Sequence, residues 1–277
     1  MLPNLIIIGA QKAGTSSLHN YLSFHPEIFM SAHKELNFFC KELNWKKGLE
    51  WYKSNFKNKK EKVKGESSPA YSQYPLYKQV SQRMHSVIPK AKLIYIIRNP
   101  LERMTSHYLD RYTVYHEQRS PEEALSEEKG RYIQFSKYFM QIEKYLKYYQ
   151  KEQILIIKNK DLREERIETL KQVFKFLGID SNFSCDDFHK MENVSKGRRK
   201  YPKQKKAKKI VRYLRGKASF VPQAIKKWMQ PNLGPGEPVE KPVLGKAAKI
   251  KILGYLKEDI EKMQDFSKLD LSDWFIN

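Results

Sequence analysis

The stretch from Leu5 to Leu18 reads LIIIGAQKAGTSSL, and it decides the fold. Its first four residues are apolar and mostly β-branched, which predicts a strand buried on both faces of a parallel sheet. A turn of small residues follows, and Thr15 is predicted to begin a helix that continues through Leu22. A strand, a glycine-containing loop and a helix N-terminus form an anion site, because backbone N–H groups and the helix dipole converge there.

The glycine spacing is close to that of a P-loop but departs from it at one point. Gly9 and Gly14 stand as in G-x-x-x-x-G, but Thr15 and Ser16 occupy the places where a Walker A motif has Lys and Ser or Thr. The lysine of this loop, Lys12, comes two residues before the second glycine. This displacement argues against a magnesium-dependent ATPase or kinase. An ordinary βα turn with a surface lysine stays open as the alternative.

Length, charge and cysteine content narrow the class of protein. A chain of 277 residues fits one large domain or two small ones, and it carries a formal net charge of +22. That charge predicts an anionic partner: nucleic acid, an acidic membrane face or a polyanionic small molecule. Cys40 and Cys185 are far apart in the sequence and are expected to be inert thiols in a reducing compartment. The N-terminal apolar run is too short for a signal peptide or a membrane span, so we expect a cytoplasmic protein.

Apolar strands alternate with amphipathic helices along the chain, which predicts an α/β fold with a parallel sheet covered on both faces. Further strands are predicted at 63–66, 92–97 and 153–158, and helices at 74–86, 100–112, 135–149, 161–177 and about 250–263. Asp161 is expected to cap the helix that ends at the glycine C-cap Gly178, and Ser120 is expected to begin another helix.

The composition changes after Glu192. No acidic residue occurs between Asn193 and Gly236, while lysine and arginine crowd the same segment, and Pro231–Pro242 is rich in proline and glycine. Such charge runs are usually solvated surfaces. We predict a basic insertion at about 199–245 whose lysine-rich part faces an anionic acceptor or a membrane surface.

Three separate places carry groups that bind anions: Gln11–Ser17, Arg98 with Ser106, and Lys196–Arg198. Arg98 follows the end of a predicted strand, where open α/β sheets place their ligands, and Ser106 lies about two turns into the next helix. His107 points about 100° away from Ser106 on that helix and is expected to be structural. One such element holds one phosphate-like group, so three of them indicate a ligand with more than one anionic centre.

In order and spacing, these motifs resemble the sulfotransferase family that uses 3′-phosphoadenosine 5′-phosphosulfate (PAPS), and within it the heparan-sulfate-type and bacterial branch. The likeness covers nearly the whole chain. Residues 11–18 are similar to the 5′-phosphosulfate loop, 97–106 to the 3′-phosphate motif, and 195–198 to the late K-G-R loop that closes over the nucleotide. Residues 34–39 (KELNFF) are similar to K-E-x-x-F-F, and 66–71 (ESSPAY) and 270–274 (DLSDW) also fit.

The resemblance implies a three-layer, P-loop-NTPase-like α/β fold in a single domain over 1–277. It also implies an enzyme, without metal, that moves a sulfuryl group from PAPS to an acceptor hydroxyl and leaves 3′-phosphoadenosine 5′-phosphate (PAP). Glu35 matches the family's catalytic base, and Lys12 would neutralise the leaving oxygen. The residues implied to bind the nucleotide are Gln11, Lys12, Ala13, Gly14, Thr15, Ser16, Ser17, Arg98, Ser106, Lys196, Gly197, Arg198, Arg199 and Lys200.

Several alternatives stay open. Ser67 stands where animal glycan enzymes have a lysine, and the basic segment is longer than theirs, so the acceptor is open. A glycan or glycolipid hydroxyl is the first expectation, by analogy only, with amines, small metabolites and protein tyrosines as others. His33 and Glu66 are rival bases. Two other classes of protein also fit in part: a P-loop-like kinase, and a nucleic-acid-binding protein that uses its basic surface, although no recognisable DNA- or RNA-reading motif accompanies that charge.

Overall fold

The structure is a computed structural model that describes residues 1–57, 60–189, 199–200 and 237–275. Five strands form one sheet in the order β2-β3-β1-β4-β5, and every neighbouring pair in it is parallel. The strands are β1 (Leu5–Gly9), β2 (Ile28–Met30), β3 (Val63–Ser67), β4 (Lys92–Ile97) and β5 (Ile154–Lys158). The stretch that opened the sequence analysis is therefore the central strand of the sheet.

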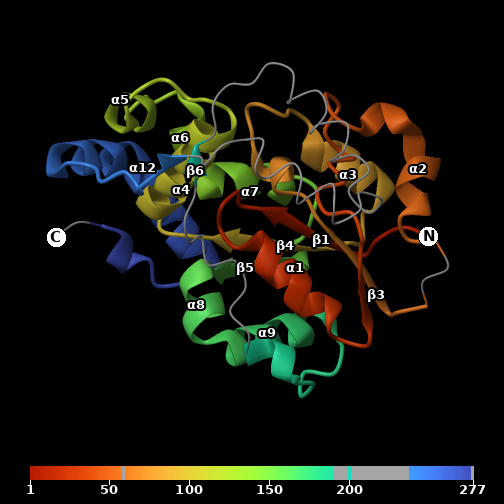
Figure 1. The fold of residues 1–277 in the computed structure, drawn as a ribbon. Helices are drawn as coiled ribbons and strands as arrows, with labels where there is room; N and C mark the ends of the chain where they lie inside the picture. Colours follow the sequence, from red (N-terminus) through yellow and green to blue (C-terminus); the bar gives the residue numbers. More distant parts are fainter. Residues whose placement is uncertain (58–59, 190–198, 201–236, 276–277) are drawn as a thin grey trace.

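Helices cover both faces of this sheet (Figure 1). On one face lie α1 (Thr15–Ser23), α8 (Asn159–Glu164) and α9 (Arg166–Leu177), and on the other α3 (Val80–Val87), α4 (Pro100–Val114) and α7 (Tyr138–Leu146). The shorter helices are α2 (Gly48–Ser54), α5 (Pro121–Leu125) and α6 (Arg131–Gln134), and the long α12 (Lys246–Ser267) packs against α7. The predicted three-layer parallel α/β fold is confirmed.

Covering helices explain the apolar runs in β1 and β4. The side chains of Leu5–Ile8 and of Leu93–Ile97 are fully buried, since no face of either strand meets water. Ile6 lies beside Leu93 and Ile7 beside Ile94 in the ladder. Within the described ranges, no helix is both long enough and apolar enough to cross a bilayer.

The chain leaves β1 and β4 in opposite directions. From β1 it passes through α1 to β2 at one edge of the sheet, and from β4 it passes through α4 to α7 and then to β5 at the other edge. The carboxyl ends of β1 and β4 are therefore a topological switch point, which is where open α/β sheets bind ligands. The fold places the 10–14 loop and Arg98 side by side at this position.

The helix predicted at 74–86 is wrong in its first half, because α3 begins at Val80. Pro75 has no backbone N–H and restricts Tyr74 to extended conformations. Gln79 has a left-handed backbone, with φ at 58°. A helix cannot run through these positions, so it begins directly after them.

The helix predicted at 161–177 is two helices. α8 begins at Asn159, so the prediction that Asp161 is an N-cap is wrong: this residue lies inside the first turn. The run breaks at Glu165, whose φ of −121° is not helical. The predicted C-cap is confirmed, because Gly178 adopts a left-handed φ of 77° and its N–H donates to the carbonyls of Phe174 and Lys175.

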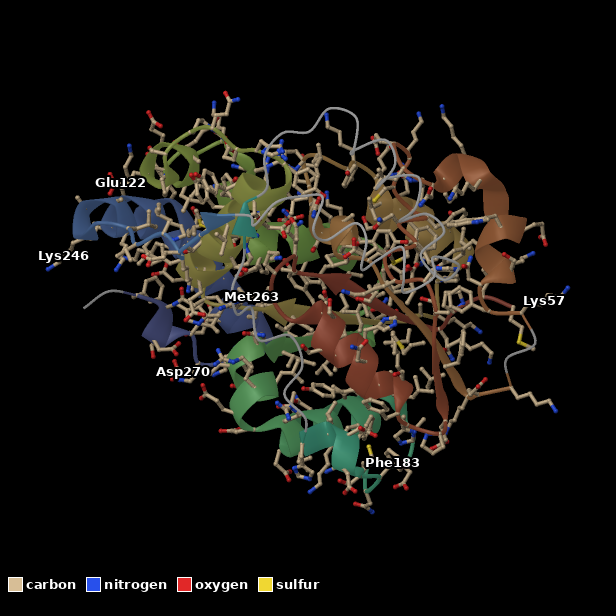
Figure 2. All side chains as sticks on the ribbon, viewed as in Figure 1. Lys57, Glu122, Phe183, Lys246, Met263 and Asp270 are labelled. Atoms are coloured by element: carbon tan, nitrogen blue, oxygen red, sulfur yellow. The ribbon has the colours of Figure 1, made fainter. Side chains whose placement is uncertain are left out.

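A carboxylate on α12 joins the C-terminal helix to α7. Asp259 accepts hydrogen bonds from the backbone N–H groups of Phe139 (2.9 Å) and Met140 (2.8 Å), in the first turn of α7. These N–H groups have no intrahelical partner, so Asp259 caps α7 from another helix. Figure 2 marks α12 by Lys246 and Met263, on the side of the molecule where α5 and α6 lie in Figure 1. Burial raises the pKa of Asp259 to about 6.

We expect Asp259→Asn to become more stable, relative to the unchanged protein, as the pH rises from 4 to 7. The folded carboxyl binds its proton more tightly than the unfolded one does. Its contribution is therefore complete below its unfolded pKa of 3.8 and is lost as the pH rises through about 6. Asparagine keeps an accepting oxygen and does not titrate. The difference in free energy of unfolding should change by up to about 3 kcal/mol between the two pH values in urea titrations. The exposed Asp265→Asn on the same helix is the control, and a difference for Asp259→Asn that stays constant with pH would contradict the prediction.

Candidate active site

The loop after β1 is fixed by contacts to two neighbouring strand ends. The backbone N–H of Ala10 donates to the carbonyl of Ile96 in β4 (2.7 Å), and Asn159, directly after β5, donates its side-chain amide to the carbonyl of Ala13 (2.9 Å). Gly14 has a left-handed φ of 100°, and a Cβ on it would lie 2.6 Å from the Asn159 amide nitrogen. Only glycine allows this approach, which brings the loop against the end of β5.

The loop ends at the positive end of a helix. α1 begins at Thr15 with Gly14 as its N-cap, no side chain caps it, and its first turn carries no acidic residue. The N–H groups of Thr15, Ser16 and Ser17 precede the first intrahelical bond, which Leu18 makes to Gly14. These amides and the hydroxyls of the two serines can bind an anion.

Lys12 and Arg98 bring two positive charges to this loop. Lys12 has a left-handed φ of 68°, and its Nζ lies 3.2 Å from an oxygen of Asp110 on α4. Arg98, at the end of β4, donates to the carbonyl of Lys12 (3.3 Å) and forms an ion pair with Glu102 (2.7 Å). The guanidinium predicted from the strand end therefore contacts the loop predicted from the glycine spacing.

Both carboxylates that pair with these cations lie on one face of α4. Glu102, Ser106 and Asp110 follow at intervals of four residues, so they form a row along the helix. Arg98 binds the first member and Lys12 binds the last. Ser106, which is half-buried, lies between them on the side of α4 that faces the loop. Ser106 thus shares a row of α4 with the carboxylate partners of Arg98 and Lys12.

A buried arginine that the sequence reasoning missed supports the loop from behind. Arg103 is fully buried, and burial lowers its pKa. It donates to the carbonyl of Tyr132 (2.7 Å), to the hydroxyl of Ser136 (2.9 Å) and to the carbonyl of Gln11 (3.5 Å). Arg103 lies on the face of α4 where apolar residues are expected, and this position is the sequence signal that could have identified it.

The predicted base lies at the mouth of this loop. Glu35 is 56% exposed, has a left-handed φ of 61°, and donates its N–H to the carbonyl of Ser67 (2.9 Å). Its neighbour Lys34 donates to the hydroxyl of Ser16 in the first turn of α1. The segment that carries Glu35 therefore contacts the first turn of α1 through Lys34, although the two are distant in sequence.

Two phenylalanines hold the backbone of this segment. Phe38 and Phe39 are buried, and Phe38 stacks on the ring of Tyr52 with the centroids 4.3 Å apart. A mobile loop would not keep a carboxylate at one place. Burial of these two rings fixes the residues that follow Glu35 to the core.

Glu66, the first rival base, has another role. It is fully buried and accepts hydrogen bonds from the hydroxyls of Tyr52 (2.6 Å), Ser68 (2.7 Å) and Tyr71 (2.9 Å). Burial raises its pKa, although the three hydrogen bonds act in the opposite direction. A carboxyl without exposed surface and with three protein donors cannot reach an acceptor in solvent, so it is a structural hub.

Comparisons with known proteins show the family of the chain. The family model described as "Sulfotransferase domain" matches residues 2–236. The chain belongs to the sulfotransferase family. Its match to human heparan sulfate glucosamine 3-O-sulfotransferase 5 is 30% identical over 195 residues, covering 66% of this chain and 55% of that protein. A bifunctional heparan sulfate N-deacetylase/N-sulfotransferase 1 of Caenorhabditis briggsae is 28% identical, with 64% and 23% covered. The chain therefore spans about half or less of the length of these relatives.

A solved sulfotransferase from Alicyclobacillus acidocaldarius has the same fold as this sulfotransferase chain, with a TM-score of 0.71, 22% identity and 99% of both chains covered. The predictions of the family and of the fold class are confirmed. The prediction of a single domain over 1–277 stays a prediction. Among the described residues of this sulfotransferase, no three His, Cys, Asp or Glu side chains gather as metal ligands.

Two further predictions concern side chains outside the loop. His107 is buried between the rings of Tyr132 and Phe135, and burial holds its pKa well below the usual value, which agrees with a structural role. Cys40 is buried, and burial raises its pKa to about 12, so it stays a neutral thiol. Neither residue supplies a group to the loop.

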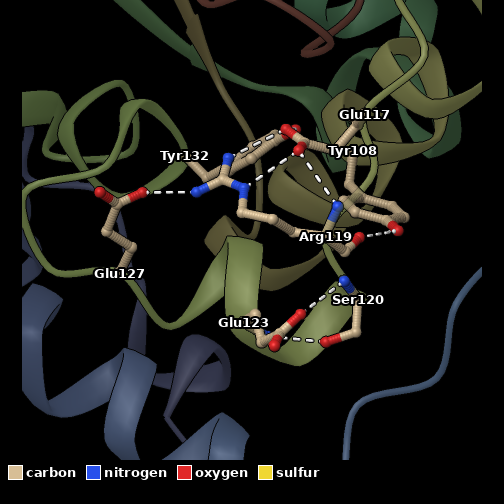
Figure 3. Close-up of polar contacts among 7 residues, drawn as sticks. All are labelled: Tyr108, Glu117, Arg119, Ser120, Glu123, Glu127 and Tyr132. Atoms are coloured by element: carbon tan, nitrogen blue, oxygen red, sulfur yellow. Dashed lines mark hydrogen bonds and ion pairs between the residues drawn. The ribbon is translucent and has the colours of Figure 1, made fainter.

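A network after α4 holds the C-terminal half of that helix in this sulfotransferase (Figure 3). Arg119 forms ion pairs with Glu117 (2.9 Å) and Glu127 (2.8 Å), and its carbonyl accepts from the Tyr108 hydroxyl (2.8 Å). The hydrogen bonds from Arg119 lower the pKa of Glu117 to about 2. The helix predicted at Ser120 begins there with a capping box. These contacts fix the end of the helix that carries Ser106 and Asp110.

Part of the predicted late basic loop lies outside the described residues: Lys196, Gly197 and Arg198, together with 201–236 of the basic insertion. The described part is β6 (Arg199–Lys200), which pairs antiparallel with β7 (Glu237–Pro238). β6 lies beside α4. The backbone of Arg199 and Lys200 therefore reaches the helix that carries Ser106.

Proposed function

We propose that this chain transfers a sulfuryl group from PAPS to an acceptor hydroxyl. The observation that carries the proposal is the pair of cations at the switch point: Lys12 and Arg98 meet at one loop and engage one face of α4, with Ser106 between their partners. Two anion positions at one site suit a nucleotide that carries both a 5′-phosphosulfate and a 3′-phosphate. Gly14, the N-cap of α1, has no side chain that could cap the amides of the first turn. These amides can therefore bind a phosphate group.

The residues divide by the group they would hold. The amides of Gly14–Ser17, with Gln11, Lys12 and Ala13 in the same loop, would bind the 5′-phosphosulfate. Arg98 and Ser106 would bind the 3′-phosphate, and Lys196–Lys200 would close over the nucleotide. Arg98 pairs with Glu102 and Lys12 pairs with Asp110, so an anionic ligand would compete with these two carboxylates for the cations.

PAPS, when bound, supplies a sulfuryl group on a phosphate that can leave. The reaction is similar to a loose phosphoryl transfer, so the protein acts mostly by positioning and by stabilising charge. Lys12 would neutralise the phosphate oxygen that departs. Glu35, exposed at the mouth, would take the proton of the acceptor hydroxyl. The rival His33 is also exposed and stays the second candidate for the base.

For the acceptor, we propose a glycan or glycolipid hydroxyl. The support is that the named relatives are sulfotransferases of heparan sulfate. We also propose that the protein is cytoplasmic and that its basic insertion contacts a membrane or an acidic glycan. Family membership favours sulfuryl transfer over the kinase and nucleic-acid-binding alternatives.

The decisive experiment is calorimetry of PAP binding in the presence of EDTA, followed by a screen of acceptors with sulfur-labelled PAPS. We expect PAP to bind without metal and more tightly than AMP, which lacks the 3′-phosphate. Sulfated product in the screen would identify the acceptor. Magnesium-dependent binding of ATP in place of PAP would favour a kinase, and a steep salt dependence of DNA binding without PAP binding would favour the nucleic-acid alternative.

Arg98→Ala is expected to weaken PAP binding about 10- to 150-fold, because a hydrogen bond between charged groups contributes about 1.5–3 kcal/mol. The affinity for AMP should change little, since that ligand has no 3′-phosphate for Arg98 to bind. Calorimetry of both ligands with both proteins gives the comparison. An equal loss for AMP would assign Arg98 to the 5′-phosphate instead.

A further inference from the structure

Lys34 supplies a third cation that the nucleotide assignment leaves unused. Its Nζ donates to the hydroxyl of Ser16, in the first turn of α1, and lies 4.0 Å from a carboxylate oxygen of Glu35. Its side chain is only 26% exposed. The ammonium group of Lys34 therefore lies between two groups of the proposed site. One is the N-terminus of α1, proposed to bind the phosphate, and the other is the Glu35 carboxylate, proposed to take the acceptor proton.

The surroundings of Lys34 favour a bound anion. Burial lowers its pKa, the Glu35 carboxylate acts in the opposite direction, and the nearby Lys12 lowers it further. The positive end of α1 adds to the same field. Two ammonium groups and a helix N-terminus repel one another, and an anion placed between them removes that repulsion.

The positions of Ser16 and Glu35 on either side of Lys34 indicate which anion Lys34 would bind. In-line transfer places the sulfur between the phosphate oxygen that leaves and the acceptor oxygen that attacks. Ser16 belongs to the phosphate side and Glu35 to the acceptor side. Lys34 contacts the first and lies beside the second, which is the location of the group in transit.

We propose, on the basis of the proposed function, that Lys34 binds the non-bridging oxygens of the sulfuryl group during its transfer. The bond between sulfur and the 5′-phosphate oxygen breaks, and its electron pair stays on that oxygen. The bond between sulfur and the acceptor oxygen forms, and the acceptor proton goes to Glu35. Lys34 makes no covalent bond; its N–H donors hold the three outer oxygens while both of these bonds are partial.

The test compares PAPS with PAP, which lacks the sulfuryl group, on Lys34→Met, Lys34→Arg and the unchanged protein. Lys34→Met should weaken PAPS binding about tenfold or more, change PAP affinity less than threefold, and lower kcat about 100-fold. Lys34→Arg keeps the charge and should retain most of the preference for PAPS. Lys53→Met, on a half-buried lysine of α2 that pairs with Glu50, is the matched control.

The pH profile gives a readout that a merely structural role would not change. Since its pKa is lowered, Lys34 should lose its proton at an alkaline pH below the usual range for lysine, and kcat/KM should fall there. Arginine does not titrate in this range, so Lys34→Arg should lose that alkaline limb.

Equal weakening of PAP and PAPS by Lys34→Met would overturn the proposal and assign Lys34 to the phosphate. An unchanged protein that binds neither ligand would instead overturn the proposed function, so the two failures are distinguishable.

Discussion

Glu35→Gln is expected to lower kcat by about 10²–10⁴, the usual contribution of general-base catalysis. The glutamine keeps the size and hydrogen bonding of the side chain and removes its ability to take a proton. PAP affinity and melting temperature should stay nearly unchanged, because the Glu35 side chain is 56% exposed and the hydrogen bond of this residue to Ser67 is made by its backbone. Initial rates under conditions where chemistry is rate-limiting, with PAP titrations alongside, provide the measurement.

The control for this variant is Glu42→Gln. Glu42 is exposed and follows the buried Phe38–Cys40 segment, a few residues beyond the proposed base. Its kcat should match that of the unchanged protein. A Glu35→Gln protein that keeps more than about a tenth of the original kcat falls outside the general-base range. The role would then pass to His33, since Glu66 is buried and held by three hydroxyl groups.

Gly14→Ala is expected to weaken PAP binding about 100-fold, which corresponds to roughly 2.7 kcal/mol. The added Cβ would lie 2.6 Å from the Asn159 amide nitrogen, at a residue with φ of 100°. Asn159 must then release the carbonyl of Ala13, and the loop moves away from the end of β5. The amides of the first turn of α1 lose their alignment with the cations.

Gly178→Ala separates this effect from backbone strain. Gly178 also adopts the left-handed conformation, with φ at 77° and ψ at 38°, but nothing lies within 4 Å of the position of its Cβ. Both variants should lose about 1–2 kcal/mol of stability from the alanine side chain in a left-handed conformation. Only Gly14→Ala should lose affinity for PAP. Equal affinities in calorimetry would mean that the loop tolerates the displacement and that the amides are not the phosphate site.

The core of the site could be predicted from the sequence because its signals are local. A β-branched run, two glycines and a Thr-Ser-Ser helix start identify β1, the loop and α1 within one stretch. Arg98 was found by a second local rule, that ligands bind where parallel strands end. The same rule, applied to the end of β5, would have found Asn159.

The supporting contacts could not be predicted, because each joins residues distant in sequence. Arg103 reaches Gln11 across 92 residues, Lys12 reaches Asp110 across 98, and Asn159 reaches Ala13 across 146. No periodicity in one segment specifies a partner so far away. The helix errors have the same origin on a smaller scale: a helical pattern was extended through Pro75 and Glu165, where backbone restrictions end or interrupt the helix.

The left-handed backbones of Lys12 and Glu35 limit how far the thermal stability of this protein can be raised without loss of activity. A non-glycine residue in that conformation costs about 1–2 kcal/mol, and the residues proposed as leaving-group cation and base both adopt it, with φ of 68° and 61°. Glycine at either position would relieve that strain. A selection for heat resistance alone would therefore favour the two substitutions that remove the leaving-group cation and the base. Thermal stability and catalytic activity would then conflict at these two residues. A thermostable variant that stays active would need stabilising substitutions elsewhere, for example at the α7–α12 contact.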